Sequence, residues 1–262
     1  MEQDTTQAIG APADVGADAE VVIAIKDLHK SFGEKKVLQG FDLTVRRGES
    51  VMVLGKSGSG KSVLIKCIVG LLKPDKGSIS VLGKDMLALD HDELDAIRVK
   101  IGFLFQSSAL YDSMTVRENL EFPLRRHAIA QEGTDRDTLV KEVLENVGLE
   151  KTIDMYPSEL SGGMRRRIGL ARTLILKPEI VLYDEPTTGL DPITGKEIVE
   201  LILQLQQKYG TSSVIISHDL NVAKLAANRI AVLIEGRNHA EGSYDELHNS
   251  DDPEVKPFFI FM

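Results

Sequence analysis

The stretch Gly55–Ser62 has the residue types and the spacing of a phosphate-binding loop. It follows the apolar run Val51–Leu54 and leads into a second apolar run from Val63, so a strand, a glycine-rich turn and a helix are expected in that order. Glycine lets the backbone approach an anion, and the first N–H groups of the helix point at the same place. We therefore expect Lys61 to reach the β- and γ-phosphates of a nucleotide and the Ser62 hydroxyl to bind Mg²⁺. The alternative is a turn that binds nothing.

Two acidic residues, Asp184 and Glu185, follow a short apolar strand expected at Glu179–Tyr183. The carboxyl ends of parallel strands form the edge of a sheet where ligands bind. Phosphoryl transfer needs a carboxylate that holds the metal, a role that suits Asp184, and a group that orients or deprotonates water, which suits Glu185. An acidic pair in a solvated loop is the alternative, and the phosphate loop upstream favours the catalytic interpretation.

Three further side chains are candidates for the same site. Gln106 ends an apolar strand and could bind Mg²⁺ or position water, and His218 follows the strand expected at Ser213–Ser217 and could bond the γ-phosphate. Phe32, in a loop between the first strands, could stack on adenine. Considered singly, each has a structural alternative: a surface glutamine, a structural histidine and a core phenylalanine.

A second glycine-rich element, Leu160–Met164, opens another expected helix. Ser161 is a good N-cap, so its hydroxyl and the helix N–H groups can form a second anion site. A capped helix start without a ligand is the alternative. The next three residues, Arg165–Arg167, are expected to form a solvated basic face.

Composition sets limits on these interpretations. The chain has 262 residues, enough for one large domain or two small ones, and its net charge of −9 argues against nonspecific nucleic-acid binding by the whole surface. The single cysteine, Cys67, excludes an internal disulfide and is expected to be buried. No basic residue precedes Lys26, and the nearly apolar run Val63–Leu72 is shorter than the ~20 residues that span a bilayer. We expect a soluble chain that meets membranes through partners.

Several elements must position these residues. Residues 1–20 are expected to be a disordered acidic tail, and a helical insert is expected at about 107–160, with a polar loop at 131–137. The other expected elements are strands at Val21–Ile25, Phe41–Val45, Gly77–Gly83, Ile101–Phe105 and Ile230–Ile234, and helices at Asp92–Arg98, Ser161–Ile175, Ile193–Lys208 and Val222–Ala227. Their alternation predicts right-handed crossovers and an α/β core.

In this order the motifs resemble those of the ATP-binding cassette (ABC) family over residues 22–247. The matching positions are Phe32 as the adenine-stacking aromatic, Gly55–Ser62 as Walker A, Gln106 as the Q-loop, Leu160–Met164 as the signature, Ile180–Glu185 as Walker B, Gly189–Asp191 as the D-loop and His218 as the switch. The resemblance implies a P-loop NTPase with a RecA-like, mainly parallel core sheet, an antiparallel β subdomain and an inserted α-helical subdomain. Residues 248–262 then form a C-terminal extension.

The resemblance also implies an ATPase that uses Mg²⁺ and works as a head-to-tail homodimer, in which residues 161–163 of one copy close over ATP in the other. The implied ATP-binding residues are Phe32, Gly55, Lys56, Ser57, Gly58, Ser59, Gly60, Lys61, Ser62, Val63, Ser161, Gly162, Gly163 and Asp191. The implied catalytic residues are Lys61, Gln106, Glu185 and His218, and the implied Mg²⁺ ligands are Ser62, Gln106 and Asp184.

Within this family the amino-acid sequence at residues 58–64, 105–116, 159–164 and 191–194 is most similar to the Mla-type branch, which moves phospholipid with MCE-domain proteins. That branch implies a transmembrane permease, MCE-domain and other accessory subunits, and a peripheral place on the cytoplasmic face of the inner membrane. The alternatives are the ATPase of a solute importer or of a lipoprotein-release system, and a cassette acting on nucleic acid or ribosomes. Only 55 positions separate Gln106 from Ser161, and there is one Walker A motif, which disfavours the last class.

The apolar end of the chain, Pro257–Met262, is unusual for a soluble protein. Exposed apolar residues of this kind promote association. We expect them to dock on their own domain or on a neighbouring copy.

Overall fold

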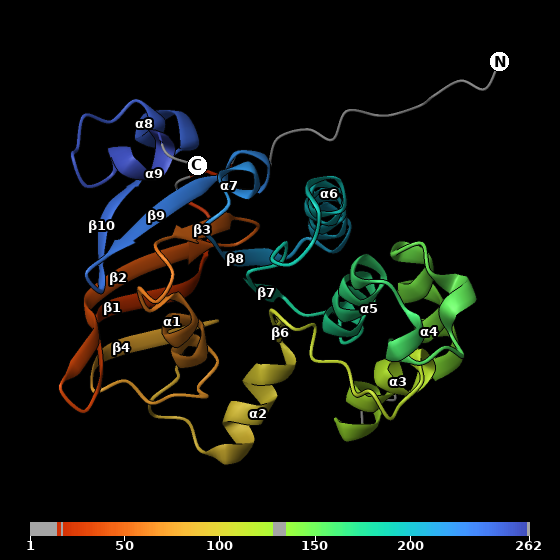
Figure 1. The fold of residues 1–262 in the computed structure, drawn as a ribbon. Coiled ribbons are helices and arrows are strands. Elements are labelled where there is room, and N and C mark those ends of the chain that lie inside the picture. The colour runs from red at the N-terminus through yellow and green to blue at the C-terminus, as the bar shows by residue number, and fades with distance from the viewer. Residues whose placement is uncertain (1–14, 17, 128–134, 261–262) are drawn as a thin grey trace.

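The computed structural model describes residues 15–16, 18–127 and 135–260, and its strands form two sheets (Figure 1). The six-stranded sheet runs in the order β10 (Arg237–Gly242), β9 (Arg229–Ile234), β3 (Ser50–Leu54), β8 (Ser212–Ser217), β7 (Ile180–Asp184), β6 (Ile101–Leu104). The four-stranded sheet runs in the order β2 (Lys35–Arg46), β1 (Val21–Phe32), β4 (Lys76–Val81), β5 (Lys84–Asp85). The larger sheet is parallel except where β9 meets β10, and the smaller sheet is antiparallel.

The helices fall into three groups. Those around the sheets are α1 (Lys61–Ile68), α2 (His91–Val99), α5 (Gly162–Leu174), α6 (Pro192–Tyr209) and α7 (Leu220–Ala226). The insert contains α3 (Val116–Arg126), α4 (Arg136–Asn146) and short 3₁₀ turns at Glu150–Thr152 and Pro157–Glu159, and the chain ends with α8 (Tyr244–His248) and α9 (Lys256–Ile260). Figure 1 shows α3 and α4 on the side of the molecule away from the four-stranded sheet. The α/β core and the helical insert agree with the sequence-based prediction.

The six-stranded sheet separates two apolar cores, because alternate residues of a strand point to opposite faces. In β3, Met52 and Leu54 belong to the core that α5, α6 and α7 cover. Val51 and Val53 belong to the other core, which also contains residues of α1 and of the four-stranded sheet. Every residue of β3, β7 and β8 is buried, as expected of parallel strands covered on both faces.

The first two strands are longer than predicted. Most of the loop expected between them is strand. Phe32 is the last residue of β1, and residues 33–34 form the turn that joins it to β2. The cause of the error is an irregularity in the pairing of β1 between Ile25 and Leu28, where Asp27 has a positive φ of 47°. Such a bulge breaks the alternation on which a strand prediction depends.

The two ends of the described chain are tied to the domain. The tail predicted at 1–20 lies mostly outside the described residues, but Glu20 forms an ion pair with Arg47 at 2.7 Å. At the other end Phe258 and Phe259 are buried in the chain's own core, so the extension docks on its own domain as far as Ile260. Among the described residues, no helix is both long and apolar enough to cross a bilayer.

Candidate nucleotide-binding and catalytic site

The phosphate loop connects β3 to α1, as the sequence predicts. Its conformation requires glycine at position 60, where φ is 110° and an added Cβ would lie 2.7 Å from Val37 Cγ1. Gly58 also has a positive φ, of 77°, with open space around its Cα. This backbone leaves room for a ligand above the loop and turns the first N–H groups of α1 toward it.

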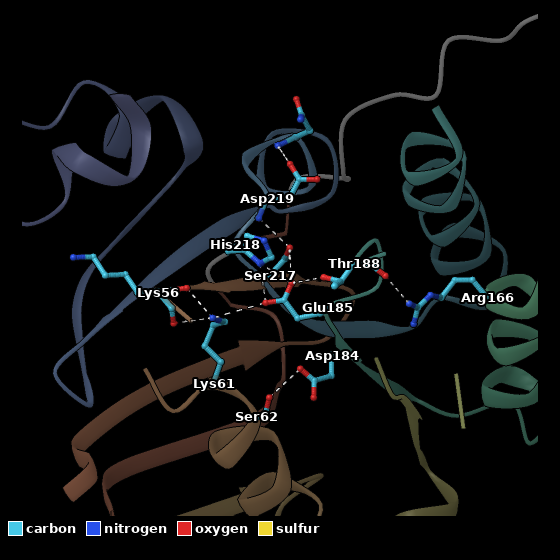
Figure 2. A network of polar contacts seen from close by, with 12 residues as sticks. Lys56, Lys61, Ser62, Arg166, Asp184, Glu185, Thr188, Ser217, His218 and Asp219 are labelled. Carbon is cyan, nitrogen blue, oxygen red and sulfur yellow. Dashed lines mark hydrogen bonds and ion pairs between the residues drawn. The ribbon is translucent and has the colours of Figure 1, made fainter. Parts of the chain in front are cut away.

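Lys61 is buried at the centre of the loop. Its Nζ donates to Gly55 O at 2.7 Å and to Lys56 O at 3.1 Å, and it lies 3.8 Å from Glu185 Oε1 (Figure 2). Burial lowers the pKa of Lys61, whereas the nearby carboxylates of Glu185 and Asp184 oppose that shift. The loop therefore holds a cation ready for an anionic ligand.

Asp184 ends β7 directly opposite the start of α1. Ser62 Oγ donates to Asp184 Oδ1 at 3.2 Å, which brings a hydroxyl and a carboxylate together at the edge of the sheet. Burial raises the pKa of Asp184, and the hydrogen bond from Ser62 acts in the opposite direction. Two oxygen ligands of this kind suit Mg²⁺.

Glu185 has a left-handed backbone conformation with φ of 50°, which is rare outside glycine. Its N–H donates to Ile216 O at 2.8 Å, so pairing with β8 maintains the conformation. The carboxylate contacts His218 Nδ1 at 2.9 Å and accepts a hydrogen bond from Thr188 Oγ1 at 3.1 Å. These contacts fix the carboxylate beside Lys61, and strained residues of this kind are common at functional sites.

A cleft of about 460 Å³ joins these groups. Its lining includes Phe32, Lys35, Val37, Ser57, Gly58, Gly60, Lys61, Ser62, Val63, Gln106, Glu185, Thr188 and His218. The structure thus brings together most of the site residues expected from the sequence. Phe32 is 49% exposed at the end of β1, and Lys30 Nζ lies over its ring at 5.4 Å from the centroid, so the ring is only partly accessible to a ligand. Lys35, Val37 and Thr188 were missed; only Thr188, a hydroxyl three residues after Glu185, had a signal in the sequence.

The structure does not bring Ser161–Gly163 or Asp191 to this cleft. Ser161 caps α5 by accepting a hydrogen bond from Met164 N at 3.2 Å. Asp191 caps α6, with Oδ1 accepting from Thr194 N at 3.0 Å. Neither residue is among those that line the cleft of its own chain.

The prediction of a solvated basic face at 165–167 was wrong for Arg166, which is 5% exposed. Arg165 is exposed and donates to Leu160 O at 2.5 Å, and Arg167 is half-buried and forms an ion pair with Glu197 at 3.1 Å. The reason is that α5 packs against β6, α3, α4 and α6, and Arg166 lies on a packed side of the helix.

The arrangement fits Mg²⁺ and ATP. Among the described residues, no group of three or more His, Cys, Asp and Glu side chains could hold a metal alone. Mg²⁺ is commonly held by one or two protein oxygens together with phosphates and water, and Ser62 and Asp184 supply that number. The buried Ser59 Oγ has no hydrogen-bond partner, as expected of a loop whose polar groups serve a ligand.

Comparison with known proteins identifies the family. A family model described as ABC transporter matches residues 38–188. This chain belongs to the ABC transporter family. It is 39% identical over 250 residues to the probable ribonucleotide transport ATP-binding protein mkl of Mycobacterium leprae (strain TN), covering 94% of this chain and 72% of the relative. It is 40% identical over 257 residues to the chloroplastic protein TRIGALACTOSYLDIACYLGLYCEROL 3 of Arabidopsis thaliana, covering 92% of this chain and 74% of the relative.

A solved structure supports the same assignment. It is a dimeric ATP-binding cassette in a post-hydrolysis state, bound to ADP and Pi. The TM-score is 0.76 with 36% sequence identity, and the match covers 85% of this chain and 98% of the solved one. The ABC fold predicted from the motifs is therefore confirmed, and this ABC protein is an ATPase that uses ATP with Mg²⁺.

Proposed function

We propose that two copies of this ABC ATPase sandwich ATP and thereby energise phospholipid transport between membranes. The observation that carries the sandwich is the position of the helix start at Ser161–Gly163, which has the features of an anion site and lies outside the cleft of its own chain. A second copy supplies the missing contact. The dimeric state of the similar solved cassette supports this arrangement.

In the proposed mechanism each residue of the cleft has one task. Lys61 neutralises charge at the β- and γ-phosphates, and Phe32 stacks on adenine. Ser62, Asp184 and Gln106 would hold Mg²⁺, which would supply positive charge to stabilise the phosphates. Glu185 accepts the proton of the attacking water, and His218 bonds the γ-phosphate while its ring orients Glu185.

The second copy closes this site with its own helix ends. Ser161, Gly162 and Gly163 present a hydroxyl and N–H groups at the positive end of α5. Asp191 lies in the exposed turn before α6, from which it approaches the other copy. Hydrolysis removes the γ-phosphate that both copies hold, so the copies separate and the transporter resets.

The phospholipid substrate is supported by two observations. The wording of residues 105–116 resembles the Mla-type branch, and the Arabidopsis relative bears the name of a galactosyl diacylglycerol, a lipid. In this proposal the ATPase is bound beneath a transmembrane permease on the cytoplasmic face of the inner membrane, together with MCE-domain and other accessory subunits. Its contact with the membrane is through these partners.

A solute importer is the second candidate. It is favoured by the M. leprae relative, whose name assigns it to ribonucleotide transport. Both candidates share the ATP chemistry, so the partners and not the cleft distinguish them.

The first prediction tests the sandwich and the base together. Glu185→Gln keeps the size of the side chain but cannot accept a proton, so the variant should bind ATP with Mg²⁺, lose at least about a hundredfold in turnover and accumulate as a dimer. Turnover is measured by phosphate release, and dimerisation by light scattering with and without ATP. Normal turnover in Glu185→Gln would show that another residue is the base.

The same trapped complex, purified from membranes, tests the cargo. Co-purification of a permease with an MCE-domain protein, and ATP-dependent phospholipid transfer between vesicles by the corresponding wild-type complex, would support the lipid proposal. A solute-binding subunit and no lipid transfer would replace it with the importer.

A further inference from the structure

Arg166 is buried near the beginning of α5 although it carries a charge. Its guanidinium bonds two segments that are far apart in the sequence: Nη1 donates to Phe105 O at 3.1 Å and Nη2 donates to Thr188 O at 3.2 Å. Phe105 immediately precedes Gln106, and Thr188 follows Glu185 by three positions. One side chain thus connects the start of α5 to both flanks of the cleft.

The burial of this charge is costly. Both acceptors are neutral carbonyls, and the buried Nε has no hydrogen-bond partner. Burial lowers the pKa of Arg166, because the charged form loses its hydration. An apolar side chain of similar volume would fill the space without that cost. The two carbonyl contacts are therefore the feature that the guanidinium supplies and an apolar residue would not.

The contact with Thr188 continues to the carboxylate. Thr188 Oγ1 donates to Glu185 Oε2 at 3.1 Å, and the same oxygen lies 2.9 Å from His218 Nδ1. Figure 2 shows Arg166, Thr188 and Glu185 in a continuous series of contacts that ends at Lys61. A displacement of Arg166 would therefore shift the segment that orients Glu185.

The segment around Gln106 also packs closely against α5. An added Cβ at Gly169 would lie 3.0 Å from both Leu104 Cδ1 and Ser108 Cβ. At Gly169, α5 is thus packed directly on the segment that contains Gln106. Since neighbouring groups in a packed interior do not move independently, α5 and this segment shift together.

We propose that Arg166 is a positioning residue that couples the start of α5 to Glu185 and Gln106 by holding Thr188 and Phe105. The inference rests on the proposed function, in which the start of α5 binds the nucleotide of the second copy and Glu185 is the base. When the start of α5 binds the nucleotide held by the second copy, α5 then sets the geometry of Glu185 in the chain to which α5 belongs. Arg166 itself touches no substrate.

The test uses the full-length chain with Arg166→Met, which keeps an unbranched side chain, two atoms shorter, and removes the donors of both contacts. We expect kcat to fall about tenfold to a hundredfold, because small misplacements of catalytic groups have effects of this size, while KM for ATP changes less than about threefold. Thr188→Val removes only the hydrogen bond to Glu185 and should also lower kcat. If both substitutions act through one series of contacts, kcat of the double variant should lie within about twofold of kcat of the slower single variant.

Two matched controls separate positioning from general destabilisation. Arg98 also donates to two backbone carbonyls, Val69 O and Gly70 O, at 3.1 Å each, but lies away from the cleft. Thr187 neighbours Thr188 and does not line the cleft. Arg98→Met and Thr187→Val should keep kcat within about twofold of the wild type even where the melting temperature falls.

The outcomes are distinguishable. Wild-type kcat in Arg166→Met, an equal loss in Arg98→Met, or fully multiplying losses in the double variant would each overturn the inference. If Arg166→Met does not fold, Arg166→Lys, which keeps one donor, should give an intermediate kcat, and wild-type kcat in Thr188→Val would then decide against the series. Glu185→Gln measured in parallel tests the proposed function separately, because normal turnover in that variant would show that Glu185 is not the base.

Discussion

Backbone and side-chain groups together hold the charges of the cleft. Lys61 donates to two carbonyls of its own loop, and the N–H of Glu185 is bonded to Ile216 O. The carboxylate of Glu185 is oriented by the side chains of Thr188 and His218. The surrounding sheet and helices fix these partners, so the charged groups need little reordering when a ligand binds. Such preorganisation is a main source of electrostatic stabilisation in catalysis.

Cys67 illustrates how burial sets reactivity at a single residue. Burial raises the pKa of its thiol from 9.0 to about 11, so the folded chain keeps the proton where the unfolded chain loses it. At pH 8 we expect alkylation by iodoacetamide to be about a hundredfold slower in the folded protein than in urea, because the thiolate is the nucleophile. The free energy of unfolding should also decrease as the pH rises from about 9 to about 11. Mass spectrometry follows the first effect, and equal alkylation rates would contradict it.

Residues whose chemistry is encoded by their local pattern were predictable from the sequence. The loop at 55–62, the acidic pair after β7 and the residues after β6 and β8 are each marked by an apolar strand followed by a polar residue. Arg166 carried no such mark, because its importance depends on contacts with Phe105 and Thr188, which no local pattern reveals. The basic run around it indicated exposure instead, which was wrong for Arg166 although Arg165 beside it is exposed.

At the scale of the element, the longer course of β1 matters because it carries Phe32 to the mouth of the cleft. The irregularity at Asp27 makes that strand bend, and the start of β4 must fit against it. Gly77 of β4 lies beside this irregularity. Its φ is 97°, and an added Cβ would lie 2.3 Å from Asp27 O. The pairing of β1 with β4 therefore depends on this glycine.

We predict that Gly77→Ala decreases the free energy of unfolding by about 3 kcal/mol or more, because both the backbone strain and the clash fall on main-chain atoms that cannot rotate away. Gly83→Ala is the matched control: its φ is 74°, but nothing lies within 4 Å of the added Cβ. Strain alone should cost it about 1 kcal/mol. Urea denaturation measures both variants, and equal losses would show that the clash is relieved elsewhere.

At the scale of the whole molecule, the C-terminal extension is an integral part of the domain. Phe259 packs edge-on against Tyr244 at 5.7 Å and against His248 at 6.1 Å between ring centroids. Together with Phe258 it joins α9 to the core that contains α5 and α6. The docking expected from the apolar end occurs within the chain for these two residues, while Phe261 and Met262 lie outside the described residues.

We expect Phe258→Ala to release α9 without unfolding the rest, because truncating a buried phenylalanine costs about 3–5 kcal/mol and a helix of five residues has little stability of its own. Hydrogen exchange should then accelerate in residues 256–260 and remain unchanged in β3 and β8. Ile260→Ala is the control, since Ile260 is 56% exposed. Global acceleration in Phe258→Ala would show that α9 supports the entire fold.

The overall architecture was predictable because apolar strands alternate with helices and because the motifs occur in the order of one family. The elements that were missed include β5, β10, α8 and α9, which contain few apolar residues or are very short. The alternating exposure of β10 gives no apolar run, and its pairing with β9 depends on a neighbour already in place. Context of this kind overrides local preference.

The division of β3 between two cores has a consequence for local unfolding. Its side chains are enclosed on both faces, and its backbone is paired on both edges, with β8 and with β9. Partial openings of the protein begin where such enclosure is least, and they reach this strand last. The end of β3, from which the phosphate loop starts, therefore keeps its structure in the partly opened forms of the chain until the whole domain denatures.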